Sequence, residues 1–234
     1  MKNEDIVLGT ALVEMYGKCG LVAKAQQVLE GLPIRDAITW NVLIAEYAQQ
    51  GQCAAALNCF EQMQSEGIPP DEVIFSCILK VCGTIGAIDR GQQIHEEIEA
   101  RALLKKDLVL GNALVDMYAK CGMLVKAQQV LEELQVRDIV SWNALITGYT
   151  QQGHDHEVLN CFKQMENEGL SPNGVTYLSI LKACGKTRDL SKGKEIHDEI
   201  VSRDLLRGDV VLGTAMVDMY AKCGMLSRAQ MVFD

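Results

Sequence analysis

Two segments contain the His-x-Glu pattern that zinc-dependent deaminases use, with histidine as a metal ligand and glutamate as a proton carrier. They are His95-Glu96-Glu97 and His197-Asp198-Glu199. Such a site also needs a later Pro-Cys-x-x-Cys, because three ligands must hold the zinc, and the sequence contains no Cys-x-x-Cys. The two histidines occupy the same point of a repeat, so we interpret them as repeat residues and predict no metal site.

Two further arrangements of reactive side chains have spacings that do not complete a site. His154-Asp155-His156 is expected in a turn between two helices, and the matching segment one repeat earlier, Gln52-Cys53-Ala54, has no histidine. Gly185-Lys186-Thr187 is similar to the end of a phosphate-binding loop, but Ile180 stands where that loop needs its first glycine. We therefore predict that the chain is not an enzyme and needs no cofactor.

The nine cysteines are an odd number, and most of them recur at equivalent places in apolar helical patterns. The recurring sets are Cys19, Cys121 and Cys223; Cys59 and Cys161; and Cys82 and Cys184. This pattern predicts small core residues in a reducing compartment rather than a disulfide framework.

Composition narrows the class of protein further. The chain has 234 residues, 48% of them hydrophobic and 23% charged, which is typical of a folded protein and not of a disordered one. No apolar run approaches the roughly 20 residues that span a bilayer. The formal charge of −9 argues against a generic basic nucleic-acid binder. The polar, acidic start at residues 1–5 predicts no signal or transit peptide in this chain.

The strongest signal in the sequence is a repeat of 102 residues. Asp5, Asp107 and Asp209 open nearly identical segments. Residues 5–106 align with residues 107–208 without a gap, and roughly half of the aligned positions are identical. An ungapped match of this extent indicates duplicated units of fixed length.

Each block divides into repeats of 31, 35 and 36 residues, here called short, standard and long. The standard repeat contains Trp-Asn and closes on Glu-Gly-x-x-Pro, and the long repeat contains Ile-Leu-Lys-x-Cys-Gly and Gly-x-x-Ile-His. A single array over 1–234 then has repeats at 5–35 (short), 36–70 (standard), 71–106 (long), 107–137 (short), 138–172 (standard), 173–208 (long) and 209–234 (short). The last repeat is shorter than its predecessors, so we expect a fragment of a longer protein. The near-identity of the two blocks is also compatible with a consensus-based design.

Every repeat has the pattern of two helices. In 107–137, apolar residues at helical spacing predict a first helix over 109–119, Gly122 ends it, and a second helix is expected over 124–134. A pair of this size cannot bury its own apolar face, whereas stacked pairs can. The sequence therefore predicts an all-α fold, a right-handed α-solenoid of helix-turn-helix repeats in triplets. The first helices should line one surface and the second helices the other.

Two sequence segments resemble those of a known family: Ala113-Leu114-Val115-Asp116-Met117-Tyr118-Ala119-Lys120-Cys121-Gly122 and Ser141-Trp142-Asn143-Ala144-Leu145-Ile146. They resemble the pentatricopeptide repeat family of plant organelle RNA-binding proteins, over residues 5–234. The repeat lengths resemble its PLS subclass, which is built from such triplets. The resemblance implies sequence-specific binding of single-stranded RNA, about one base per repeat. It also implies a role as target specifier in RNA editing or processing, in a mitochondrion or chloroplast.

Family members read each base with two side chains, here called the first and second readers. The first lies on the first turn of a first helix, and the second lies just before the next first helix. The resemblance places the pairs at Thr10 with Asp36, Asn41 with Asp71, Asn112 with Asp138, and Asn143 with Asn173. Their amide, hydroxyl and carboxylate groups can bond to the Watson–Crick edge of a base. The family code implies G, U, U and C for these four pairs.

The long repeats depart from this pattern. Ser76 with Asp107 is a further candidate pair and Thr214 a further candidate first reader, whereas Leu178 places an apolar side chain at that position. Long repeats are therefore expected to act as spacers. The hypothesised RNA site, read 5′ to 3′ along the chain, is G-U-n-U-C.

A β-branched residue stands three residues before each first-reader position. The seven residues are Val7, Ile38, Val73, Val109, Val140, Val175 and Val211. The family uses this position to sandwich a base, which makes Val7, Ile38, Val109, Val140 and Val211 candidate base-sandwiching residues. Packing in the core is the alternative explanation, because β-branched residues are common at helix starts.

Charge is unevenly distributed among the expected helices. The first-helix segments are nearly neutral, so the acidic residues concentrate in second helices and linkers. Lys18, Lys120 and Lys222 recur near the end of a first helix, where contact with an RNA phosphate is one interpretation. The other is a solvated lysine that interacts favourably with the helix dipole.

Two other functions fit a helical repeat array. A tetratricopeptide-like scaffold for proteins or peptides shares the helix-pair plan and the mean repeat length. The family resemblance also implies small editing-factor proteins, of the multiple organellar RNA editing factor type, as partners docked through the long repeats. No membrane or metal partner is expected.

Overall fold

The computed structural model describes residues 2–104, 107–207 and 209–233, with side chains from Val7 onward. This part of the chain forms fourteen α-helices and no strand. The odd-numbered helices are α1 (Lys2–Lys18), α3 (Ala37–Gln49), α5 (Glu72–Ile85), α7 (Leu108–Lys120), α9 (Ile139–Gln152), α11 (Gly174–Thr187) and α13 (Val210–Lys222). The even-numbered helices are α2 (Val22–Gly31), α4 (Cys53–Ser65), α6 (Ile88–Ala100), α8 (Leu124–Glu133), α10 (Asp155–Asn167), α12 (Leu190–Ser202) and α14 (Leu226–Phe233).

Side-chain caps start the odd-numbered helices. From α3 to α13, an Asp or Asn directly before the helix accepts a hydrogen bond from a backbone N–H of the first turn. These capping residues are Asp36, Asp71, Asp107, Asp138, Asn173 and Asp209. Such a cap satisfies an N–H that has no partner inside the helix.

Left-handed residues end these helices and turn the chain into the second helix of each pair. Gly51, Gly122 and Gly153 have φ of 71°, 80° and 76°, a region that glycine enters without steric cost. Gly86 does the same after α5. Arg188 ends α11 at the equivalent position with φ 57°, although it carries a side chain.

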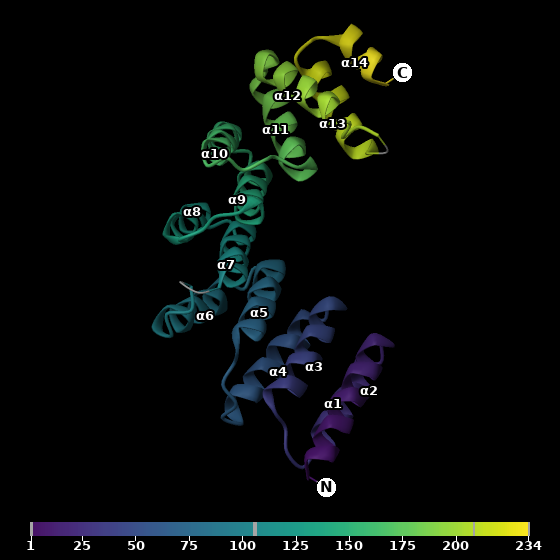
Figure 1. Cartoon of the computed structure of the whole chain (residues 1–234), viewed down its shortest axis with the longest axis vertical. Coiled ribbons are helices and arrows are strands. Elements are labelled where there is room, and N and C mark those ends of the chain that lie inside the picture. Colours follow the sequence, from purple (N-terminus) through teal and green to yellow (C-terminus); the bar gives the residue numbers. More distant parts are fainter. Residues whose placement is uncertain (1, 105–106, 208, 234) are drawn as a thin grey trace. The chain divides into compact units, whose positions relative to one another are not determined.

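The chain divides into two compact units, Met1–Cys121 and Gly122–Asp234. In the first unit α1, α3, α5 and α7 contact one another in turn, and in the second α9, α11 and α13 do so. The odd-numbered helices therefore form a continuous layer within each unit. The even-numbered helices cover one side of it, with α4 against α3 and α5, and α10 against α9 and α11 (Figure 1).

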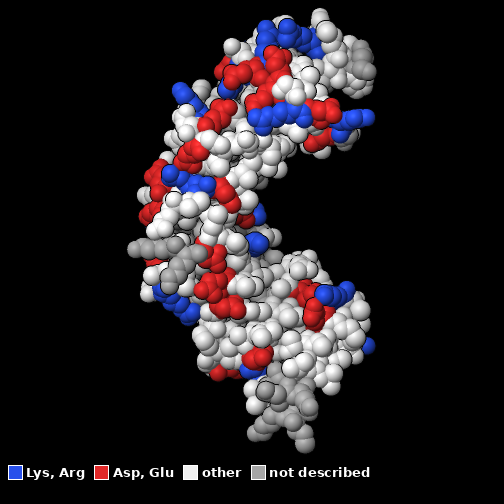
Figure 2. All heavy atoms as spheres, viewed as in Figure 1, with Lys and Arg blue, Asp and Glu red and all other residues white. Residues whose placement is uncertain are grey.

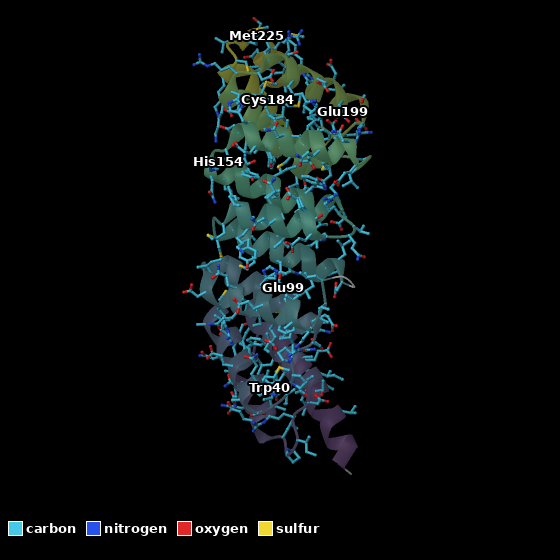
Figure 3. All side chains as sticks on the ribbon, turned by 90° about the vertical axis from the view of Figure 1, so that its left-hand side faces the viewer. Trp40, Glu99, His154, Cys184, Glu199 and Met225 are labelled. Atoms are coloured by element: carbon cyan, nitrogen blue, oxygen red, sulfur yellow. The ribbon has the colours of Figure 1, made fainter. Side chains whose placement is uncertain are left out.

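Large apolar and aromatic side chains fill the space between the two layers. Trp40, Phe60 and Phe162 are at most 1% exposed, and Tyr177 and Tyr220 are fully buried. Figure 3 labels Trp40 and Cys184 among the side chains on the stacked helices, and both are buried. Stacking thus gives each amphipathic pair the partner that its own length cannot supply.

The expected all-α fold of helix pairs is confirmed, and the helix bounds are close to the predicted ones. The helices expected over 109–119 and 124–134 are α7 and α8, which differ by at most one residue at each end. The division into seven repeats and the single array over 1–234 stay predictions. In the part of the chain that the structure describes, no helix is both long and apolar enough to cross a bilayer.

All nine cysteines are free, as the sequence predicts. Burial raises the pKa of Cys59 and Cys82 to about 11, and burial with a nearby carboxylate raises the pKa of Cys161 and Cys184 to about 12. These thiols are neutral at physiological pH. They therefore act as small core residues and not as nucleophiles, because the thiolate is the reactive form.

Candidate functional site

The second readers have a structural task in addition to their expected one. Every one of them is the N-cap of an odd-numbered helix. The capping oxygen faces the backbone of that helix. The first reader contacts the other carboxylate oxygen of Asp71 and the capping oxygen itself of Asn173. Capping therefore fixes the orientation of the second reader relative to the helix that it caps.

Asn41 and Asp71 meet in the first unit. The Nδ2 of Asn41 donates to Oδ2 of Asp71 at 2.7 Å, while Oδ1 of Asp71 accepts from the backbone N–H of Ile74 at 2.9 Å. Asn41 is half-buried, and its Oδ1 is buried without a hydrogen-bond partner. The pair retains one N–H of Asn41 and further lone pairs of the carboxylate for a ligand.

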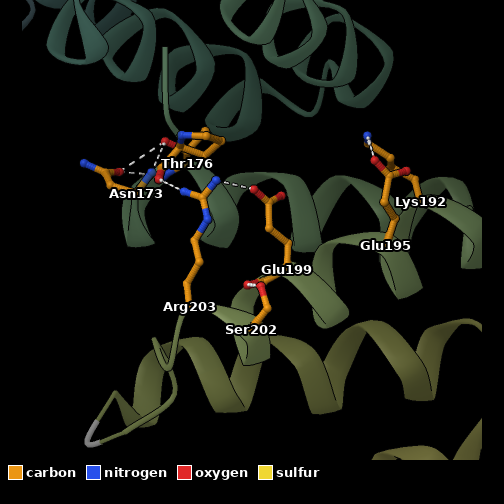
Figure 4. Close-up of polar contacts among 8 residues, drawn as sticks. Asn173, Thr176, Lys192, Glu195, Glu199, Ser202 and Arg203 are labelled. Carbon is orange, nitrogen blue, oxygen red and sulfur yellow. Dashed lines mark hydrogen bonds and ion pairs between the residues drawn. The ribbon is translucent and has the colours of Figure 1, made fainter. Parts of the chain in front are cut away.

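Asn143 and Asn173 also meet in the second unit, but here the capping oxygen of the second reader accepts the hydrogen bond. The Nδ2 of Asn143 donates to Oδ1 of Asn173 at 3.1 Å, and the hydroxyl of Thr176 donates to Oδ1 of Asn143 at 2.7 Å. Figure 4 shows Asn173 and Thr176 joined at the start of α11. Arg203 fixes the same segment by donating to the carbonyl oxygen of Pro172 at 3.3 Å and by pairing with Glu199.

Thr10 and Asp36 are linked through a third residue. The hydroxyl of Thr39 donates to Oδ1 of Asp36 at 2.6 Å and lies 2.9 Å from the hydroxyl of Thr10. The three side chains come from α1, from the turn before α3 and from the first turn of α3. The structure therefore brings this predicted pair together by way of a buried threonine.

The remaining candidate readers have more varied surroundings. Asn112 is half-buried on α7 in the first unit, and Asp138 caps α9 in the second. The hydroxyl of Thr214 donates to the carbonyl oxygen of Val210 in its own helix at 2.7 Å. Leu178 is half-buried.

Ser76 and Asp107 line a cavity of about 600 Å³ between α3, α5 and α7. Val73 and Val109 lie on its wall, and most of the other lining side chains are apolar. Ser76 itself is 8% exposed. The first long repeat therefore has an open, mainly apolar hollow at its reading position.

All seven β-branched residues before the readers are exposed to solvent, with exposed fractions of 51% to 70%. Each lies in the first turn of an odd-numbered helix or, for Val7, within α1. Core packing is thereby excluded as the reason for their presence. A row of solvated apolar groups beside polar pairs is suited to a flat, partly apolar ligand.

The recurring lysines are already paired. Lys18 contacts Glu14 at 2.6 Å, and Lys120 and Lys222 each contact an aspartate four residues earlier at 2.7 Å. The hydrogen bond that Lys18 donates to Glu14 raises the pKa of Lys18, so the ammonium stays charged while its charge is locally compensated. A phosphate at these sites would compete with the carboxylate.

Negative charge lies mainly on the even-numbered helices. α9 contains no charged residue, whereas α6 and α10 carry several exposed carboxylates. Figure 2 shows Asp and Glu side chains gathered along these helices. Figure 3 labels Glu99, which lies on α6, and Glu199, which lies on the even-numbered α12. The surface formed by the odd-numbered helices is thus the less repulsive one for a polyanion.

The two His-x-Glu segments serve the contacts between helix pairs. His95 Nδ1 lies 2.9 Å from the hydroxyl of Tyr118, and His197 Nδ1 lies 2.7 Å from the hydroxyl of Tyr220. Among the described residues, no three His, Cys, Asp or Glu side chains gather in a way that would hold a metal ion. His154 caps no N–H with its side chain and stands at the edge of the stack (Figure 3).

Sequence reasoning missed the hydroxyl groups that touch the readers. Thr39 and Thr176 are fully buried in the third position of their helices, where each contacts both a first and a second reader. The signal was present as an Asp or Asn followed three residues later by Thr or Ser, a pattern typical of a helix start. This pattern does not predict the contact of the hydroxyl group with the first reader of the preceding repeat.

Two family models match the chain. The PPR repeat family matches residues 35–84 and 137–186, and the PPR repeat matches residues 112–139, 175–205 and 214–234. These segments include most of the candidate readers.

Two curated proteins of Arabidopsis thaliana are similar over nearly the whole chain. Pentatricopeptide repeat-containing protein At4g18520, chloroplastic, is 37% identical over 100% of this chain and 38% of its own length. Pentatricopeptide repeat-containing protein At3g09040, mitochondrial, is 38% identical over 98% of this chain and 22% of its own length. The chain thus spans well under half the length of these relatives.

A solved structure has a similar fold. It is the crystal structure of the pentatricopeptide repeat protein PPR10 in complex with an 18-nt psaJ RNA element. The similarity covers 96% of this chain and 34% of that chain, with a TM-score of 0.78 and 22% sequence identity.

Proposed function

The chain belongs to the pentatricopeptide repeat family, and from that premise we propose that it binds single-stranded RNA sequence-specifically, with about one base per repeat. The observation that carries the proposal is the arrangement repeated along the odd-numbered helices. A polar pair that retains free donors or acceptors stands next to an exposed β-branched side chain. Helical repeats that read one base each with two or three side chains use this kind of surface.

Hydrogen-bonding capacity supports the expected base at two pairs. Asn41 and Asp71 together offer a donor and acceptors, which matches the adjacent carbonyl oxygen and ring N–H of uracil. Asn143 and Asn173 retain only N–H donors toward a ligand, which matches the ring nitrogen and carbonyl oxygen of cytosine. The proposed readers are those named above, and the proposed site remains G-U-n-U-C.

The cellular role of the whole protein is part of the proposal. Relatives named chloroplastic and mitochondrial support an organellar location. The alternation of short, standard and long repeats supports the PLS subclass and a role as target specifier in RNA editing or processing. Within that role the chain acts as a binding scaffold, and small editing-factor proteins are its proposed protein partners.

The proposal is tested by a binding titration with a labelled RNA that contains G-U-n-U-C. A scrambled RNA of equal composition is the control. We expect the target to bind at least tenfold more tightly, since each well-matched base contributes roughly 1 kcal/mol or more. Equal binding of both RNAs would refute sequence-specific recognition, and binding to neither would favour the peptide-scaffold alternative.

Replacement of a first reader tests the assignment of pairs to bases. Asn41→Thr converts the second pair into the Thr–Asp combination found at Thr10 and Asp36. We expect the preference at the second nucleotide to shift from U toward G by roughly tenfold, because one bidentate contact is worth about 1–3 kcal/mol. The measurement is competition among four RNAs that differ only at that nucleotide. An unchanged preference would refute the assignment.

A further inference from the structure

The hydroxyl of Thr176 occupies a position that no reading scheme based on two side chains includes. It lies in the first turn of α11, fully buried, and it contacts residues of two successive repeats. Its oxygen is 2.7 Å from Oδ1 of Asn143 and 3.1 Å from Oδ1 of Asn173. We infer that Thr176 is a positioning residue that sets which atoms of Asn143 face the RNA, an inference that rests on the proposed function.

The orientation of both amides follows from the backbone of α11. The N–H groups of Val175 and Thr176 donate to one side-chain atom of Asn173, at 3.1 Å and 3.2 Å, so this atom is the amide oxygen. The atom of Asn143 that faces it at 3.1 Å is therefore a donor, the amide nitrogen. The carbonyl oxygen of Asn143 then faces the Thr176 hydroxyl, which donates its single proton to it at the shorter of its two distances.

This chain of contacts turns the carbonyl oxygens of both amides toward the protein. Figure 4 shows the amide nitrogen of Asn173 directed away from Thr176. The groups left for a ligand are the second N–H of Asn143 and the amide nitrogen of the exposed Asn173. A site with only donors favours cytosine, whose Watson–Crick edge offers a ring nitrogen and a carbonyl oxygen as adjacent acceptors, over uracil, whose ring nitrogen carries a proton.

The first unit contains a natural comparison for this arrangement. Ile74 stands at the position equivalent to Thr176, and it has no hydroxyl. Asn41 is held by Asp71 alone, and its Oδ1 is buried without a hydrogen-bond partner. The carboxylate of Asp71 orients Asn41 through a charge-assisted hydrogen bond, which is stronger than a neutral one. The pair with two amides lacks that charge and relies on the threonine instead.

The experiment compares Thr176→Val with Thr176→Ser. Valine keeps the shape and removes the hydroxyl, whereas serine keeps the hydroxyl. Binding is measured with four RNAs that differ at the fifth nucleotide of G-U-n-U-C. We expect Thr176→Val to lower the ratio of C to U affinity by roughly threefold to tenfold, the size of one hydrogen bond. Thr176→Ser should keep this ratio, and preference at the second nucleotide should not change in either variant.

Loss of helix capping is controlled by Ser141→Ala. Ser141 makes the same reciprocal cap with Asp138 at the start of α9. Its replacement should lower the melting temperature as Thr176→Val does, but leave the fifth-nucleotide ratio unchanged. A wild-type ratio of C to U affinity in Thr176→Val would overturn the inference. An equal fall of that ratio in Ser141→Ala would also overturn it.

A second measurement needs no RNA. The side-chain amide signals of Asn143 in the free protein should shift and exchange faster with solvent in Thr176→Val, and stay in place in Thr176→Ser. Unchanged signals in Thr176→Val would overturn the positioning role. If the wild-type chain does not distinguish G-U-n-U-C from a scrambled RNA, the proposed function itself fails, and the amide signals then report separately on the Thr176 contact.

Discussion

At the scale of single residues, exposed apolar groups are more informative than buried ones. The burial of Trp40 or Phe60 follows from the packing of any helical repeat. A single exposed valine needs no explanation, but an exposed β-branched residue that recurs at the same point of every repeat does. Val140 is 56% exposed on α9, one turn before Asn143. Val125 is 72% exposed on α8 and therefore provides a matched control.

Val140→Ala should weaken RNA binding by roughly threefold to tenfold while leaving the free energy of unfolding within about 0.5 kcal/mol of wild type. The affinity falls because apolar area is lost beside the base, about 25 cal/mol for each Å². Stability is nearly unchanged because the side chain is solvated in the free protein. Titration and urea unfolding measure the two effects. An equal loss of affinity in Val125→Ala would refute the sandwich role.

His197 gives a residue-scale prediction about pH. Burial lowers the pKa of its imidazole below the usual value of 6.5, with Arg228 lowering it further and Asp198 opposing. The hydroxyl of Tyr220 also faces the ring, at 2.7 Å from Nδ1. The unfolded chain therefore binds a proton below about pH 6.5 that the folded chain does not bind, and the stability of the fold falls as the pH falls.

We expect the loss of stability at low pH to be smaller in His197→Asn than in the wild type. The free energy of unfolding of the wild type should decrease between pH 7 and pH 5 more steeply than that of the variant, by less than about 1.4 kcal/mol per pH unit, the limit for one group. Denaturant titrations at several pH values measure it. His156→Asn, at an exposed site, is the control. A wild-type slope in His197→Asn would contradict the prediction.

The sequence predicts which residues act as readers from residue type and spacing, but it does not predict how the structure holds them. Asp71 and Asn173 are recognisable as helix starts and as proposed second readers, because both tasks need an oxygen just before a helix. The buried contact between Thr176 and Asn143 depends on how two helices from successive repeats approach one another. A sequence pattern within one repeat carries no information about that distance.

At the scale of helices and turns, the repeated sequence provides its own comparison set. Gly86 and Arg188 stand at equivalent points after α5 and α11, and both adopt left-handed backbone, with φ of 72° and 57°. Glycine pays no steric cost there, whereas a residue with a side chain does. The second long repeat therefore has a strained turn that the first lacks.

Arg188→Gly should stabilise the chain by about 1 kcal/mol, because the left-handed conformation costs a residue with a side chain about 1–2 kcal/mol and glycine recovers most of it. Gly86→Arg should destabilise the chain by a similar amount. Both changes lie at exposed sites away from the readers, so RNA affinity should be unchanged. Denaturant midpoints measure the shifts. A lower midpoint for Arg188→Gly would contradict the strain argument.

Most of the helical architecture was predictable, because the spacing of apolar residues and the residues typical of turns indicate the same helix bounds in every repeat. Apolar spacing and Gly122 located α7 and α8 nearly to the residue. The start of α1 was not predicted: Asp5 resembles the caps Asp107 and Asp209, yet α1 begins at Lys2. Residues 2–5 include no proline or glycine that would prevent a helix from extending past the expected boundary.

At the scale of the whole molecule, a net charge of −9 must be reconciled with the proposed polyanionic ligand. The uncharged α9 and the acidic α6 and α10 show that the repulsive charge is kept largely off the odd-numbered helices. Affinity should then come from base contacts more than from phosphates. A shallow dependence on salt follows, because few counterions are released when RNA binds.

We expect three carboxylates to influence this salt dependence. Glu14, Asp116 and Asp218 each pair with a lysine at the end of an odd-numbered helix. Exposed pairs of this type contribute little to stability, so removing the acid should leave the fold intact. The combined variant Glu14→Gln, Asp116→Asn and Asp218→Asn frees three ammonium groups for phosphates. Each phosphate contact on a single strand adds about −0.7 to the slope of log affinity against log salt.

We expect this variant to bind RNA more tightly at low salt and to steepen that slope by up to about 2, measured by titrations between 50 and 200 mM salt. The matched control is Glu96→Gln, Glu133→Gln and Glu157→Gln, which changes the net charge equally at exposed sites on α6, α8 and α10. A slope that rises equally in both variants would mean that only total charge matters. A steeper slope in the first variant alone would place the RNA backbone beside Lys18, Lys120 and Lys222. The two variants have the same net charge, so only a local change at these lysines could alter the number of counterions released.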